Sequence, residues 1–111
     1  MTSLRLAPED LLAKLPTADG KRFVVGFEHG TLSVELYAPR GVDPQLPHTR
    51  DEVYVVVSGS GTFVHGDRSD PFVAGDFLFV AAAVPHRFVD FSDDLAVWVL
   101  FYGPEGGERA G

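Results

Sequence analysis

The chain contains no cysteine, so neither a disulfide nor a metal site with thiolate ligands is possible. No apolar run reaches membrane-spanning length, and the N-terminus lacks a basic, apolar signal segment. Basic residues are also few, because nine Lys and Arg stand against sixteen Asp and Glu, for a net charge of −7. This balance argues against binding to nucleic acid or to an anionic membrane surface. We therefore expect a cytoplasmic protein with neither kind of partner.

Length and composition predict one all-β domain. A chain of 111 residues with 45% hydrophobic content and nine Phe supports a single core. Short apolar runs separated by Gly and Pro turns are typical of a β-sandwich or barrel. The expected strands cover residues 22–28, 31–37, 53–57, 62–65, 71–73, 77–80, 87–91 and 96–102, with a turn at His29-Gly30 between the first two. A helix over residues 8–15 has Pro at its start and acidic residues in its first turn.

These elements divide the chain into three parts. Residues 1–20 are expected to form an N-terminal segment that carries the short helix, and residues 21–102 the β-barrel. Residues 103–111 are rich in Gly and charge, so we expect a flexible C-terminal tail.

His48 and Glu52 precede the apolar run Val53-Tyr54-Val55-Val56-Val57. Their spacing suits one face of either a helix or a strand, but Pro47 and the β-branched run favour a strand. His48, Glu52 and Tyr54 would then share a face, while Asp51 points the other way into solvent. The pair alone is equally compatible with two surface polar residues at a strand entrance.

His86 adds a second imidazole at the start of another predicted strand, directly after Pro85. Two His and one Glu from separate strands form a ligand set for a mononuclear metal site with open positions. The spacing His48-x3-Glu52-x6-Gly59 resembles the latter part of the first cupin motif. The stretch Gly75-x5-Ala81-x-Ala83-x2-His86-x3-Asp90 resembles the second motif, Gly-x5-Pro-x-Gly-x2-His-x3-Asn, in spacing throughout.

The resemblance to the cupin family covers residues 31–102 and implies a double-stranded β-helix, or jelly-roll barrel. Ala81, Ala83 and Asp90 depart from the family's Pro, Gly and Asn at positions that shape the backbone. The family's first His is replaced by Leu46, which cannot bind a metal. A bulge at this irregular entrance would let Gln45 supply a fourth ligand through its amide oxygen, although it could equally cap a loop or line the pocket.

The resemblance implies a metal site with Gln45, His48, Glu52 and His86 as ligands for one divalent transition metal. Fe, Mn, Ni, Zn, Co and Cu all accept nitrogen and oxygen ligands, so the metal identity stays open. Strand parity makes five side chains candidate walls of a substrate pocket: Arg50, Tyr54, Phe88, Trp98 and Tyr102. Each aromatic is alternatively plain core, and Arg50 alternatively forms a salt bridge at the rim.

Three functions remain open at this stage. The first is a metal-dependent enzyme, most readily a dioxygenase, acting on a small oxygenated molecule. The second is a non-catalytic cupin that binds a metal or small ligand, or an isomerase-type cupin, and the third is a structural barrel without metal. Strands that are apolar on both faces, such as residues 53–57 and 97–102, favour a homodimer packed sheet against sheet, the alternative being that the helix or the other sheet covers the second face.

Overall fold

The computed structural model describes residues 2–109 and confirms the predicted all-β class. Its elements are α1 (Pro8–Leu12), β1 (Phe23–His29), β2 (Leu32–Tyr37), β3 (Asp51–Ser58), β4 (Ser60–His65), β5 (Arg68–Val73), β6 (Phe77–Val80), β7 (His86–Val89) and β8 (Ala96–Tyr102). Strands β6 and β8 have the predicted bounds, whereas α1 is shorter than predicted and ends at Leu12. Within residues 2–109, no helix has the length and apolar character needed to cross a membrane.

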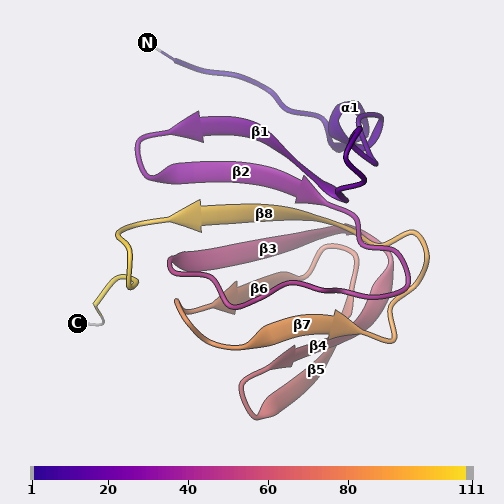
Figure 1. Ribbon diagram of the computed structural model, residues 1–111, viewed down its shortest axis with the longest axis vertical. Helices are drawn as coiled ribbons and strands as arrows, with labels where there is room; N and C mark the ends of the chain where they lie inside the picture. Colours follow the sequence, from indigo (N-terminus) through magenta and orange to yellow (C-terminus); the bar gives the residue numbers. More distant parts are fainter. Residues whose placement is uncertain (1, 110–111) are drawn as a thin grey trace.

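The strands form two antiparallel sheets (Figure 1). A core rich in aromatic side chains lies between them. The larger sheet has the order β1-β2-β8-β3-β6 and the smaller one β5-β4-β7. Tyr54 of β3 contacts the rings of Phe63 and Phe88 from the smaller sheet, with centroids 5.9 and 5.0 Å apart. All three side chains are buried. These contacts hold the two sheets together as a jelly roll, the predicted architecture.

The first hairpin turns one residue later than the sequence suggested. His29 pairs with Leu32, so the two-residue loop is Gly30-Thr31 and His29 belongs to β1. Gly30 has φ +59°, a left-handed conformation that glycine adopts without strain. Leu36 is buried as expected from the alternation in β2, but so are Ser33 and Tyr37 on the opposite face. Both faces of this strand are therefore covered.

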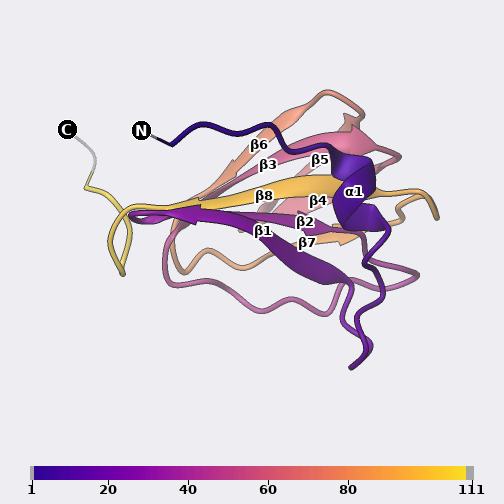
Figure 2. The same ribbon diagram turned by 90° about the horizontal axis from the view of Figure 1, so that it is seen from above.

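The outer face of the larger sheet carries two rows of apolar side chains. Cross-strand pairing places Phe27, Val34, Leu100, Val53 and Phe79 in one row, and Val24, Leu36, Trp98, Val55 and Phe77 in the other. Helix α1 packs near β1 and β2 (Figure 2). The side chain of Leu11 lies against Gly26 of β1. On β6, at the opposite edge of the sheet from β1, the side chains of Phe77 and Phe79 are 67% and 48% exposed.

Asp51 is buried, contrary to the prediction that it is solvated. Its carboxylate accepts hydrogen bonds from the backbone N–H groups of Ala82 (2.9 Å) and Glu108 (2.8 Å). The N–H of Gly106 also donates to the carbonyl of Thr49 (2.7 Å). Parity alone could not predict this, because the backbone after β8 returns to cover the start of β3. The expected flexibility of residues 103–111 stays a prediction, and residues 110–111 lie outside the described range.

Candidate metal centre

Three side chains that can bind a metal, those of His48, Glu52 and His86, lie close together. One potential ligand atom from each of His48, Glu52 and His86 lies within 4.8 Å of the others. Oε1 of Glu52 is 2.9 Å from Nδ1 of His48 and 2.8 Å from Nε2 of His86. Glu52 and His86 are buried, whereas His48 is partly exposed. The structure thus brings together the two imidazoles and the carboxylate that the sequence singled out.

Each of the three residues comes from a different local structure. Glu52 lies on β3, which pairs with β6 and β8 on its two sides, and His86 begins β7. His48 is not on the strand, as the sequence suggested, but in the loop before β3. Its carbonyl accepts a hydrogen bond from Ala83 N–H (2.7 Å), which ties this loop to the loop before β7.

Hydrogen bonding orients the His86 ring toward the carboxylate. Nδ1 of His86 lies 2.8 Å from the carbonyl oxygen of Val84, which can only accept, so Nδ1 carries a proton. In the metal-free protein Nε2 donates to the ionised Glu52, so the ring is an imidazolium, and loss of the Nε2 proton would give the arrangement of a ligating imidazole. Burial lowers the pKa of His86, but the hydrogen bonds to Glu52 and Val84 outweigh it and raise the pKa overall.

Glu52 is ionised at neutral pH although it is buried. Burial raises its pKa, but hydrogen bonds to His48 and His86 dominate and lower the pKa to about 2. Its second oxygen, Oε2, is buried and has no hydrogen-bond partner within the described residues. A buried carboxylate oxygen without a partner is unfavourable, and a cation at this point would satisfy it.

Gln45 lies beside the cluster, and its amide is held in one orientation. Its Nε2 donates to Oδ2 of Asp43 (2.7 Å), and its Oε1 accepts from the Tyr54 hydroxyl (2.8 Å). Because a carboxylate only accepts, Asp43 fixes the amide nitrogen on its own side and turns Oε1 toward Tyr54. Oε1 is the atom through which an amide binds a metal. Leu46, at the family's usual His position, is 76% exposed.

Tyr54 closes the network between Gln45 and His86. Its hydroxyl oxygen lies 3.0 Å from Nε2 of His86, and the side chain is fully buried. Burial, followed by the nearby charge of Glu52, raises the pKa of Tyr54 well above its usual value, so it stays a neutral phenol.

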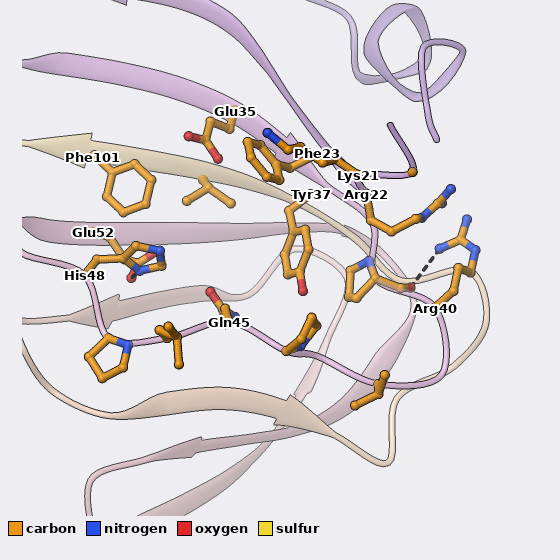
Figure 3. Close-up of a pocket in the computed structure, with 17 residues that line it drawn as sticks. Lys21, Arg22, Phe23, Glu35, Tyr37, Arg40, Gln45, His48, Glu52 and Phe101 are labelled. Carbon is orange, nitrogen blue, oxygen red and sulfur yellow. Dashed lines mark hydrogen bonds and ion pairs between the residues drawn. The ribbon is translucent and has the colours of Figure 1, made fainter. Parts of the chain in front are cut away.

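A cavity of about 640 Å³ opens beside the cluster (Figure 3). His48, Glu52 and Gln45 contribute to its wall, as do Glu35, Tyr37, Val99 and Phe101 from the larger sheet. A smaller cavity of about 310 Å³ has His86 and Gln45 in its wall. The cluster therefore lies between two cavities, and the larger one is of a size that holds small organic ligands.

None of the five predicted pocket residues forms part of the wall of either cavity. Tyr54 and Phe88 are buried in the core, and Val99 and Phe101 of β8 face the cavity, so Trp98 and Tyr102 point to the opposite face of the sheet. Arg50 donates to the carbonyl of Thr31 and lies over the Phe101 ring, 5.9 Å from its centroid. We therefore assign Val99 and Phe101, not Trp98 and Tyr102, to the cavity wall.

Sequence reasoning missed three polar residues of this region: Glu35, Tyr37 and Asp43. Asp43 is buried and accepts hydrogen bonds from the Tyr37 hydroxyl and from Phe88 N–H (2.8 Å) as well as from Gln45. Glu35 is half-buried in the cavity wall, and burial raises its pKa despite the opposing influence of His48. The alternation Ser33, Glu35, Tyr37 could have marked this face of β2 as the wall of a polar cavity.

Comparison with known proteins is consistent with this geometry. Residues 33–102 match the Cupin domain family. An uncharacterized protein of Streptomyces coelicolor is 36% identical over 107 residues, which are 95% of this chain and 99% of that relative.

Two solved structures share the fold at low sequence identity. A cupin-2 domain containing protein from Shewanella frigidimarina superposes with a TM-score of 0.70 at 16% identity, covering 88% of this chain and 94% of that one. A cupin 2 conserved barrel domain protein from Salinispora arenicola gives a TM-score of 0.68 at 16% identity, covering 93% of this chain and 90% of that one.

An antiparallel jelly roll with His and Glu side chains gathered inside it defines a class of small β-barrel proteins built to hold a ligand. The chain belongs to the cupin family. Two departures from the second motif fall where the backbone is left-handed, because Ala83 and Asp90 have φ +69° and +50° where the family has Gly and Asn. Asp tolerates this left-handed conformation far better than Ala does.

Proposed function

We propose that this cupin binds one divalent transition metal through His48, Glu52 and His86 and acts on a small oxygenated molecule in the larger cavity. The observation that carries the proposal is the convergence of three ligand atoms within 4.8 Å, two of them from buried residues. Two imidazoles and a carboxylate suit Fe, Mn, Ni, Co, Cu or Zn. The unpartnered Oε2 of Glu52 supports a cation at this place.

We propose Gln45 as the fourth ligand through Oε1. The support is the hydrogen bond from Gln45 Nε2 to Asp43, which leaves Oε1 directed at the Tyr54 hydroxyl beside His86. Tyr54 would then donate its hydroxyl proton to whichever oxygen lies next to it, because its raised pKa keeps the phenol protonated.

The reaction class that fits best is dioxygenation. His48, Glu52 and His86 would hold the metal, which would supply polarisation of an oxygen donor on the substrate and, if it were iron, chemistry with dioxygen. The chain itself supplies an apolar wall from Val99 and Phe101 that excludes water from one side of the cavity. Glu35 supplies a carboxyl group whose raised pKa lets it hold a proton where an exposed Glu has lost it.

A non-catalytic binding cupin is the alternative, and one observation favours it. His48, Glu52, His86, Tyr54 and Gln45 already form a connected hydrogen-bond network among themselves. Such a network can hold the barrel's interior together without turnover, in which case the cavity serves ligand capture alone.

Oxygen consumption separates the two functions. Iron-loaded and zinc-loaded protein would be compared on a panel of small hydroxy, keto and phenolic compounds, with Glu35→Gln alongside. We expect substrate-dependent oxygen uptake by the iron form only, reduced in Glu35→Gln without loss of iron. Ligand binding with no oxygen uptake on any substrate would support the binding cupin instead.

We further propose that the protein is a homodimer that packs through the outer face of the larger sheet. The two apolar rows cross all five strands, and their uncovered end carries the exposed Phe77 and Phe79. A two-fold contact between identical copies buries the same patch twice, which is the commonest way to cover such a surface.

A further inference from the structure

Two arginines line the end of the larger cavity away from the metal cluster. Arg22 directly precedes β1, and Arg40 follows β2. Figure 3 shows both guanidinium groups at one end of the cavity and His48 and Glu52 at the other, with Gln45 between them.

Backbone carbonyl groups hold the two guanidinium groups next to each other. Arg22 donates from Nε to the carbonyl of Ala38 (2.8 Å), and Arg40 donates from Nη1 to the same carbonyl (3.3 Å). Nη1 of Arg40 also lies within hydrogen-bond distance of the carbonyls of Pro39 (3.0 Å) and Leu95 (3.4 Å). A shared acceptor thus fixes two like charges side by side. Burial, and then the charge of Arg40, lowers the pKa of Arg22.

No carboxylate of the described residues compensates these charges. Between residues 2 and 109, neither Arg22 nor Arg40 has a carboxylate oxygen within 4.0 Å. This is unexpected in a chain with sixteen acidic residues against nine basic ones. The two carboxylates of the cavity wall, Glu35 and Glu52, lie toward its other end (Figure 3).

The remaining N–H donors of such a pair match the geometry of an oxyanion. A guanidinium group offers five donors in a planar fork, and the backbone carbonyls occupy only some of them. Two adjacent forks without a counter-ion attract a carboxylate or phosphate by charge and bind it by paired hydrogen bonds. Lys21 also lines the cavity, but its Nζ lies 5.6 Å from the centre of the Phe23 ring and 3.6 Å from Asp19, whose charge offsets its own.

We propose that Arg22 and Arg40 form an oxyanion subsite that binds the terminal carboxylate or phosphate of the protein's small-molecule ligand. The cavity volume of about 640 Å³ accommodates an elongated organic anion whose other, oxygenated end reaches His48 and Glu52. Contact of the oxygenated end with His48 and Glu52 rests on the proposed metal site, whereas anion binding by Arg22 and Arg40 does not. The substrate class is therefore a small oxygenated acid or phosphate ester.

The test is calorimetric titration of chelator-treated, metal-free protein with inorganic phosphate and, separately, with glutarate. The variants are Arg22→Gln with Arg40→Gln, and Arg40→Gln alone, which changes an exposed residue and is expected to fold. Arg68→Gln, at the exposed first residue of β5, is the control and makes the same change of charge as Arg40→Gln alone. Circular dichroism checks the fold of each variant.

We expect saturable binding of at least one probe by the wild type and by Arg68→Gln. The double variant should bind at least tenfold more weakly, a difference of about 1.4 kcal/mol. Preference for phosphate or for glutarate identifies the anion. Equal binding by the double variant, or no saturable binding of either probe by the wild type, would overturn the subsite. Metal uptake is measured separately, so failure of the metal site leaves this outcome unaffected.

Discussion

At the scale of single residues, the cluster depends on side chains that fix one another's protons. Val84 fixes the proton on Nδ1 of His86, and Asp43 fixes the amide of Gln45. Both partners are acceptors, so the atoms that face the cluster are Nε2 of His86 and Oε1 of Gln45. Partners of this kind matter nearly as much for metal affinity as the ligands themselves.

Substitutions of Gln45 and of Leu46 should affect metal affinity differently. Gln45→Ala removes a proposed ligand and should weaken binding, and Asp43→Asn, which frees the Gln45 amide to turn over, should weaken it by about 10–100-fold. Leu46→His should leave affinity unchanged, because this side chain is 76% exposed. Competition with a chromophoric chelator measures all three. Tighter binding by Leu46→His with no effect of Gln45→Ala would remove Gln45 from the ligand set.

Glu35 predicts a pH dependence of stability. Burial raises its pKa in the folded protein above the ordinary value of 4.5, so the folded state holds this proton more tightly than the unfolded state does. The free energy of unfolding should therefore fall as pH rises from 4.5 through the folded-state pKa. Glu35→Gln should abolish this decline, and Glu105→Gln, in the exposed tail, should not. Denaturant titrations of metal-free protein between pH 4 and 8 measure the free energy of unfolding. The same pH dependence in the wild type, Glu35→Gln and Glu105→Gln would refute the role given to Glu35.

At the scale of elements, β3 and the loop before β7 position the site. β3 carries Glu52 and Tyr54 on its inner face, and the loop ending at Pro85 ties His48 to the barrel through Ala83 N–H. Ala83 has φ +69°, which is unfavourable for any residue with a β-carbon. This loop therefore holds strain at the point where it supports a proposed ligand.

Ala83→Gly should stabilise the protein. Relief of the left-handed conformation contributes about 1–2 kcal/mol, and the greater entropy of the unfolded glycine chain offsets about 0.5–1 kcal/mol of it. Ala81→Gly, two residues earlier and without a positive φ, should destabilise instead. Thermal unfolding of both variants gives the comparison, and a lower melting temperature for Ala83→Gly would contradict the assigned conformation.

The sequence predicted the strands better than it predicted which face of a strand is inside. The bounds of β6 and β8 follow from apolar runs that end at turns. Parity on β2 and β8 could not identify the cavity wall, because both faces are covered: Leu36 and Tyr37 are both buried. Asp51 was misjudged for a related reason, since backbone N–H groups from distant loops carry no side-chain signal in the sequence.

At the scale of the whole molecule, two arginines without an ion-pair partner among residues 2–109 lie at one end of the cavity, and a potential cation site lies at the other. Arg22 and Arg40 lie far along the cavity from Glu52 (Figure 3). A ligand with an anionic end and an oxygenated end satisfies both. The outer face of the larger sheet is separate from this cavity and is free to form an interface.

Phe77 tests the proposed dimer. Phe77→Asp introduces a charge into the apolar face and should convert a dimer into a monomer without unfolding the barrel, because the side chain is 67% exposed. Val73→Asp, at 59% exposure on the smaller sheet, is the matched control and should stay dimeric. Sedimentation equilibrium measures the mass. A monomeric wild type, or a Phe77→Asp dimer of unchanged affinity, would exclude this interface.

Elemental mass spectrometry of untagged, unchelated protein tests most directly whether His48, Glu52 and His86 hold a metal ion. The wild type should carry about one transition metal per chain, because the three residues form a single cluster. His86→Ala should lose the metal while keeping the β-sheet circular dichroism signal. His65→Ala, whose ring pairs with Asp70 outside the cluster, should retain it. Wild-type protein that is metal-free and takes up no added Fe, Mn, Ni or Zn, or His86→Ala protein that keeps its metal, would contradict the account.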